Sequence, residues 1–276
     1  MKEYIAVMVV ISVLSFSPRM IQAGWVGTPS GPNSVAGKHY YSKGERPVLE
    51  HQGKSIIGKP VENEQGDYLG RIADLMISPE NGGMTFAVLS HGGILGIPMR
   101  FVAVPFESLA FSPEKNVYLL NVSKERMAAA PGFNRGYWPD VANREWDQEI
   151  YKYYGQTPPW GGSEESIPAS QDQGIRFNQI MGVAVRNEQG EELGTIDDII
   201  IDSHGHVPFG IVAHGGFLGM DQKLVAVPFW ALKFEKRETE FVLNSTKEKL
   251  DAAPAFKATD LAHKKWIEDT QRIFGP

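Results

Sequence analysis

The feature that most constrains this chain is an internal duplication. Several stretches recur at a nearly constant offset, too many for chance similarity. They are Gly58–Gly66 with Gly182–Gly190, Leu69–Asp74 with Leu193–Asp198, Phe86–Gly93 with Phe209–Gly216, Val102–Phe106 with Val225–Phe229, and Ala130–Pro131 with Ala253–Pro254. The length of 276 residues accommodates two compact domains, each able to bury its own core. The chain is therefore expected to fold as two copies of one small domain in tandem.

Each copy has the pattern of a β domain. Asn63–Gly66 lies between two apolar stretches, and its Asn and Gly tolerate the positive φ angles of a hairpin turn. The segments 68–77 and 192–201 are rich in β-branched residues in partial alternation, and further strands are expected near 84–90, 101–104 and 117–122 with counterparts in the second copy. The pattern predicts a mainly β protein with two tandem small antiparallel β-barrels, which limit their own open edges.

A helical tail is expected after each barrel. Ser123 and Thr246 have the side chains of helix N-caps, and each short helix should end before the Ala-Pro pair that follows. Longer helices are predicted to begin at Asp140 and Asp260 and to end at glycine, with an apolar stripe facing the barrel. In the first tail the stripe is Ala142, Trp146, Ile150 and Tyr153, and in the second it is Ala262, Trp266, Thr270 and Ile273.

These motifs resemble the PRC-barrel domain, a small β-barrel named for the H subunit of photosynthetic reaction centres. The resemblance is carried by the opening Gly58-x-x-Val and Gly182-x-x-Val, by the segments ending at Asp74 and Asp198, and by the Val-Pro-Phe segments at Pro105 and Pro228. It covers about 55–155 and 179–275. The resemblance implies a role in docking and assembly rather than chemistry. The sequence shows no features that indicate contact with a pigment or a quinone, unlike the reaction-centre subunit.

The remaining segments divide the chain. Residues 1–23 contain the apolar run Tyr4–Phe16 and end at Ala23, which is typical of a cleaved signal peptide because a spanning helix needs about 20 apolar residues. Residues 24–54 and 156–178 are linkers by composition, so the repeats with their tails are expected at 55–155 and 179–276. The protein is therefore predicted to be exported to the periplasm or cell envelope. A retained N-terminal segment would instead associate it with a membrane.

Composition and motifs restrict the function. The net charge of −6 provides no basic face for nucleic acid, and the absence of cysteine excludes disulfides, thiolate catalysis and Cys-ligated zinc. The Gly-Gly-x-x-Gly segments are not followed by Lys-Ser/Thr or by a helix, so they do not match a phosphate loop. No catalytic residue, cofactor or metal site is predicted, and the chain is not expected to be an enzyme.

His91 and His214 are the candidate binding residues. They occupy equivalent positions, each directly before Gly-Gly, and imidazole is a common metal ligand. A metal needs three or four converging ligands, and neither copy offers others at a recognisable spacing. Asp197 and Asp198 alternate along a strand and should point to opposite faces. Asp74, the counterpart of Asp198, should accept backbone hydrogen bonds.

The leading hypothesis is an exported, non-enzymatic scaffold that binds a protein partner of unknown identity. The alternative is an envelope protein that binds a small ligand or metal through the His-Gly-Gly loops, and a hydrolase ranks behind both. The two barrels are expected to pair as a pseudo-dimer within one chain, because a two-fold interface is self-complementary. The loops at Gly92-Gly93 and Gly215-Gly216 or the helical tails are expected to contribute to that contact.

Overall fold

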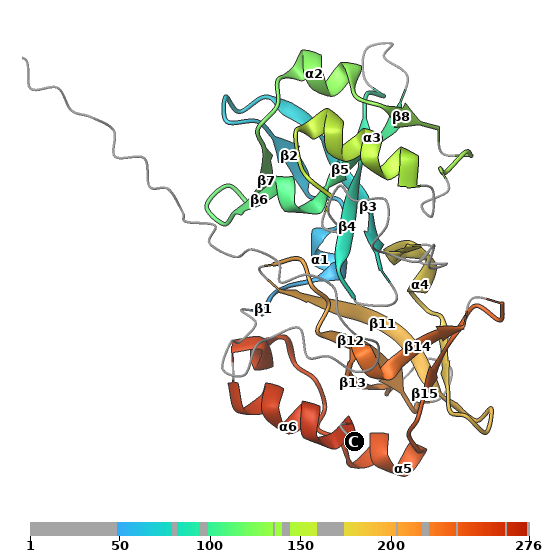
Figure 1. Ribbon diagram of the computed structural model, residues 1–276. Coiled ribbons are helices and arrows are strands. Elements are labelled where there is room, and N and C mark those ends of the chain that lie inside the picture. Colours follow the sequence, from blue (N-terminus) through green and yellow to red (C-terminus); the bar gives the residue numbers. More distant parts are fainter. Residues whose placement is uncertain are drawn as a thin grey trace, which may run out of the picture. The chain divides into compact units, whose positions relative to one another are not determined.

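A computed structural model describes residues 49–78, 82–93, 99–134, 136–139, 144–158, 174–202, 204–216, 221–235, 237–262 and 264–274 (Figure 1). The expected signal peptide at 1–23 lies outside the described residues, as do Asp140 and Ala142. Both repeats belong to one compact unit of the chain. Among the helices of the described residues, none has the length and apolar character needed to span a membrane.

The first repeat forms one sheet in the order β6-β7-β2-β3-β4-β5-β8. Its strands are β2 (Pro60–Glu62), β3 (Tyr68–Ile77), β4 (Met84–His91), β5 (Arg100–Pro105), β6 (Leu109–Ser112), β7 (Val117–Leu120) and β8 (Gly132–Phe133). The short 3-10 turn η1 (Phe106–Ser108) joins β5 to β6.

The second repeat has the order β13-β12-β11-β10-β15-β14. Its strands are β10 (Ala184–Arg186), β11 (Glu192–Asp202), β12 (Phe209–His214), β13 (Lys223–Pro228), β14 (Leu232–Glu235) and β15 (Glu240–Leu243), with η2 (Phe229–Ala231) at the equivalent turn. The expected fold class is confirmed, with one difference. One pair in each repeat, β2 with β7 and β10 with β15, is parallel, because β2 and β10 each pair with the last strand of their repeat.

The predicted hairpin turn forms in both repeats. The Asn63 side-chain oxygen accepts hydrogen bonds from the Gln65 and Asp67 amides, at 3.1 and 2.7 Å. Gly66 takes a φ of 82°, which its missing side chain permits. Asn187 and Gly190 reproduce the arrangement in the second repeat. The turn is thus fixed by local chemistry that the duplication has kept.

Both faces of the central strands are buried. One continuous apolar core contains residues of both repeats, Val61 and Ile72 from the first and Val185 and Ile196 from the second. The opposite face of β3, β4 and β5 is covered by helix α3 (Arg144–Tyr154), and that of β11, β12 and β13 by α6 (Lys264–Phe274). Each tail helix is therefore the second layer of its own repeat.

The short tail helices begin at the predicted caps. In α2 (Lys124–Ala129) the Arg126 amide donates to the Ser123 hydroxyl at 3.2 Å, and in α5 (Lys247–Ala252) the Lys249 amide donates to Thr246 at 3.3 Å. The start expected at Asp260 is wrong. Asp260 lies in the 3-10 turn η3 (Ala258–Ala262), where its carboxylate accepts from the Lys257 amide, and the helix begins at Lys264.

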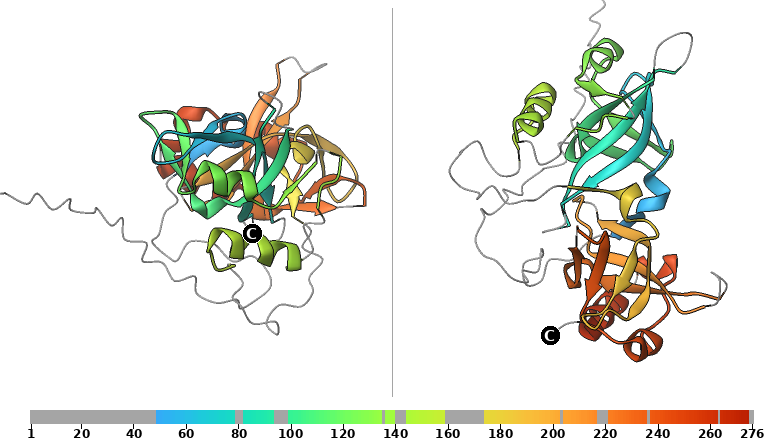
Figure 2. Two further views of the ribbon diagram at one scale, coloured as in Figure 1. Left: turned by 90° about the horizontal axis from the view of Figure 1, so that it is seen from above. Right: turned by 90° about the vertical axis from the view of Figure 1, so that its right-hand side faces the viewer.

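The segment that opens each repeat pairs with the sheet of the other repeat. Strand β1 (Leu49–Gln52) pairs antiparallel with β11, and helix α1 (Gly53–Ile56) follows it. Strand β9 (Ile175–Arg176) pairs antiparallel with β3, followed by α4 (Phe177–Ile180). In the right view of Figure 2, blue α1 and yellow α4 lie at the level where the strands of the two repeats meet.

This exchange alters the expected boundaries. Strand β1 starts at Leu49 and β9 at Ile175, inside the ranges 24–54 and 156–178 that composition assigned to linkers. These segments are too short and too polar to be recognised as strands by their own pattern. They gain order from the sheet to which they add.

Candidate functional site

Two buried carboxylates anchor the exchanged segments. Asp74 is 2% exposed and Asp198 is 1% exposed, and each lies at a β-bulge in β3 or β11. Asp74 accepts backbone hydrogen bonds from Leu75 and from Asn178 of α4, both at 3.0 Å. The expectation that Asp74 accepts such bonds is confirmed, and one of its donors comes from the other repeat.

Asp198 repeats this geometry in the opposite direction. Its carboxylate accepts from the Ile199 amide at 2.8 Å and from the Lys54 amide of α1 at 3.0 Å. Burial raises the pKa of the Asp198 carboxyl above its ordinary value, and the two backbone donors oppose that rise. The same balance raises the pKa of Asp74. Each carboxylate thus holds the first turn of a short helix from the other repeat.

The neighbouring Asp197 differs from expectation. Strict alternation would send Asp197 and Asp198 to opposite faces, but the bulge between Ile196 and Asp198 interrupts the alternation. Asp197 pairs with the Lys54 side chain at 2.7 Å, while Asp198 accepts from the backbone amide of the same residue. Both carboxylates therefore serve the contact with α1.

The two short helices meet through an unequal pair of residues. Gly53 and Phe177 occupy equivalent positions, the first of α1 and of α4. A Cβ added at Gly53 would lie 2.5 Å from the Phe177 ring and 2.8 Å from the Ile199 side chain. Phe177 is 2% exposed. The ring of one repeat therefore fills space that the glycine of the other leaves open.

A second contact joins the turns between the long strands. Met84 donates its amide to the Gly205 carbonyl and Val207 donates to the Gly82 carbonyl, both at 2.8 Å. The two pairs form an antiparallel bridge between Gly83 and His206. Among the described residues, the exchanged segments and these turns join the repeats, whereas the expected Gly92-Gly93 and Gly215-Gly216 follow the opposite ends of β4 and β12.

His91 makes a local contact at the end of β4. Its Nδ1 lies 2.7 Å from the Leu69 carbonyl oxygen, and its side chain is partly exposed. Gly92 and Gly93, which follow it, take φ angles of 88° and 79°, in the left-handed region that favours glycine.

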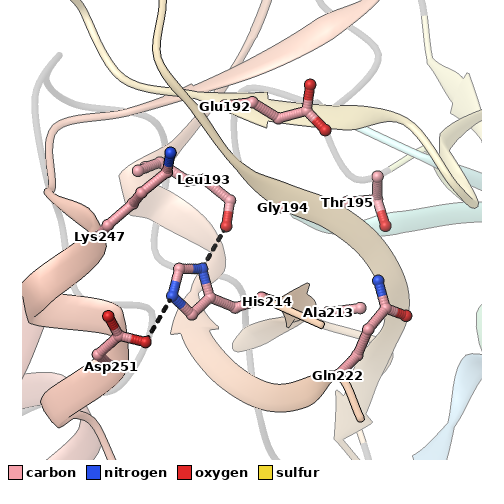
Figure 3. Close-up of a pocket in the computed structure, with 10 residues that line it drawn as sticks. Glu192, Leu193, Gly194, Thr195, Ala213, His214, Gln222, Lys247 and Asp251 are labelled. Atoms are coloured by element: carbon pink, nitrogen blue, oxygen red, sulfur yellow. Dashed lines mark hydrogen bonds and ion pairs between the residues drawn. The ribbon is translucent and has the colours of Figure 1, made fainter. Parts of the chain in front are cut away.

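His214 is more enclosed than its counterpart. Its Nδ1 is hydrogen bonded to the Leu193 carbonyl, and its Nε2 lies 3.1 Å from a carboxylate oxygen of Asp251 on α5. The His214 side chain is 5% exposed and that of Asp251 is 71% exposed. They border an open hollow of about 500 Å³, which Lys247, Gln222 and Thr195 also line (Figure 3).

Among the residues that the structure describes, His91 and His214 each lack the further ligands that a metal site needs. Within the described ranges, no group of three or more His, Cys, Asp or Glu side chains is arranged to hold a metal ion. Sequence reasoning missed Asp251, the partner of His214. The available signal was a difference between copies, because the repeat alignment places Ala128 opposite Asp251.

Aromatic side chains gather at the tail of the first repeat. Trp138 stacks on Phe101 with ring centroids 5.7 Å apart, and the Arg176 guanidinium lies 4.2 Å from the Trp138 ring centre. The adjacent Tyr137 is 81% exposed. Trp138 is thus packed against both the barrel and the exchanged strand β9, and Tyr137 projects into solvent beside it.

Comparison with known proteins agrees with this architecture. The family model of the PRC-barrel domain matches residues 50–127 and again 172–250. The first match includes β1 from residue 50 onward and all of α1, and the second includes all of β9 and α4. No protein of curated function matches the chain.

Proposed function

We propose a function for this chain from the premise that it belongs to the PRC-barrel domain family. Its function is that of a non-enzymatic, exported scaffold that binds a protein partner. The observation that carries this proposal is a reciprocal exchange of strands: β1 of the first repeat pairs with β11 of the second, and β9 of the second pairs with β3 of the first. The exchange joins the two domains into one body. Such a body presents two related surfaces to a partner at a fixed spacing.

The hydrogen-bond partners of four buried polar side chains support a structural role for those side chains. Asp74, Asp198 and Asn63 are engaged with backbone amides, and His214 with a backbone carbonyl. A catalytic site needs a nucleophile or a general acid and base held within reach of a substrate. These four side chains instead bond to backbone groups and so position strands and turns.

The partner is proposed to dock on the aromatic surface at Tyr137. Tyrosine supplies a large contact area at a low cost in side-chain entropy and is enriched at protein interfaces. Tyr137 is exposed, whereas the neighbouring Trp138 is held by Phe101 and Arg176. The negative net charge makes nucleic acid an unsuitable partner.

Site-specific photo-crosslinking tests this proposal. A photoreactive phenylalanine analogue is placed at Tyr137 in the full chain, with the same analogue at Lys265, an exposed position on α6, as the matched control. We expect a discrete crosslinked protein in envelope fractions from position 137 and none from position 265. Equal crosslinking at both positions, or none at either, would contradict the assignment of the surface.

Export is tested separately. Mass spectrometry of the native protein should give a mature chain that begins close to Gly24. A full-length product in the cytoplasm would refute export while leaving the docking surface to be judged by the crosslinks.

A second candidate function is favoured by the hollow beside His214. It would bind a small ligand in this hollow, with His214 and Asp251 as polar contacts. Thermal-shift screening of a small-molecule library against the wild-type chain and His214→Ala, with His91→Ala as the matched control, separates the candidates. Saturable binding that only His214→Ala abolishes would favour this function over the scaffold.

A further inference from the structure

The contact between His214 and Asp251 depends on a proton. The Leu193 carbonyl can only accept a hydrogen bond, so Nδ1 of His214 must carry a hydrogen. The Asp251 carboxylate at Nε2 can also only accept. Both bonds exist together only when the ring carries a proton on each nitrogen. With one acceptor at each ring nitrogen, His214 can make both hydrogen bonds only as an imidazolium ion.

Several charged side chains surround the His214 ring, and their residue types decide which group changes its charge near neutral pH. Glu192 comes from β11, Lys223 from β13, and Lys247 and Asp251 from α5. Lys223 donates to the Leu250 carbonyl at 3.1 Å and also to that of Asp251, while Lys247 pairs with Glu191 at 3.1 Å. Of these residue types only histidine ordinarily changes its charge between about pH 5 and 8. The lysine contacts therefore persist while the His214 contact is made or lost.

The first repeat lacks this device. His91 keeps the equivalent bond to the Leu69 carbonyl, but the position of Asp251 is occupied by Ala128. Arg100 takes the place of Lys223 and donates to the Met127 and Ala130 carbonyls at 3.2 and 3.0 Å. Helix α2 is thus held by contacts that do not titrate near neutral pH, and the chain contains its own control.

We propose that His214 and Asp251 form a proton-operated latch that fastens helix α5 to the end of β12 in the second repeat alone. Protonation of His214 closes the latch and tightens the start of the C-terminal tail. Loss of the proton leaves the Nε2 lone pair facing a carboxylate, and the exposed Asp251 side chain turns to water. The latch goes beyond the scaffold function and does not depend on it.

Amide hydrogen exchange of the full chain tests the latch. The informative amides are Leu250, which donates to the Thr246 carbonyl, and Met127, which donates to Ser123 at the equivalent place in α2. We expect the protection factor of Leu250 to fall about two- to fivefold between about pH 5 and pH 8, the range of an ion pair with one exposed member. The protection factor of Met127 should stay constant.

Two substitutions of Asp251 complete the test. Asp251→Ala, which copies the first repeat, should leave Leu250 at its high-pH protection at every pH. Asp251→Asn should also remove the pH dependence but keep protection high, because its amide can donate to the neutral ring. Equal pH dependence in the wild type and in Asp251→Ala, or in Leu250 and Met127, would overturn the proposal, as would a wild-type Leu250 that does not respond to pH.

Discussion

Exchanging Gly53 and Phe177 tests whether these two residues specify the pairing of the repeats. Phe177→Gly removes a ring that is 2% exposed, and removal of a buried phenylalanine side chain typically costs about 3–5 kcal/mol of unfolding free energy. Gly53→Phe adds a second ring where even a Cβ would lie 2.5 Å from the Phe177 ring. Overpacking of this kind typically costs about 1–3 kcal/mol or more.

The double variant Gly53→Phe/Phe177→Gly restores one ring and one glycine in exchanged positions. Because both residues open a short helix and both helices hold equivalent places, the ring of the variant should fill the space vacated at position 177. We expect the double variant to be at least about 2 kcal/mol more stable than the sum of the single effects, a coupling typical of residues in contact.

Urea unfolding at equilibrium, followed by tryptophan fluorescence, measures the three variants against the wild type. A matched control combines Gly53→Phe with Ser123→Ala, a substitution at a helix cap outside this contact. That pair should be additive within about 0.5 kcal/mol. Additivity of the Gly53 and Phe177 effects to the same tolerance would refute the complementarity.

Three further predictions concern pH, caps and metal. Burial raises the pKa of Asp198 in the folded chain, so its contribution to stability is fully present below the pKa of the unfolded chain and is lost as pH rises through the folded pKa. Asp198→Asn cannot ionise, so its gain in unfolding free energy over the wild type, measured by urea titration, should grow as pH rises above about 4. Ser123→Ala and Thr246→Ala should each lower the unfolding free energy by about 1 kcal/mol, and replacement by glycine by only a few tenths. Elemental analysis of gently purified protein should find no stoichiometric zinc, copper or iron, and chelator treatment should leave the thermal midpoint unchanged; a bound metal lost in His214→Ala would contradict this.

The fold class followed from the sequence because it depends on local chemistry repeated twice, and the family followed from a resemblance in the same motifs. The Asn63–Gly66 turn is built by a side chain that bonds amides two and four residues away. The cap at Ser123 reaches three residues ahead. The residues that form such a turn or cap lie within a few positions of one another, so sequence pattern and propensity identify them. Their recurrence in the second repeat showed that these motifs did not arise by chance.

The tertiary structure alone decided which repeat each segment serves. Strand β1 pairs with β11, which lies about 150 residues further along the chain. The Asn178 amide that donates to Asp74 is 104 residues away from it. The sequence correctly made Asp74 an acceptor of backbone hydrogen bonds, yet no local pattern could name a donor so distant.

The candidate site divides in the same way. Sequence singled out His91 and His214 as equals, because the two His-Gly-Gly motifs are identical. Folding made them unequal by bringing Asp251 of α5 to 3.1 Å from His214, across 37 residues of chain. A carboxylate at such a distance in sequence has no fixed spacing from its partner, since the intervening strands and turns, not the sequence interval, place it. The sequence determined which residues could act, and the packing of tail against barrel determined which of them met.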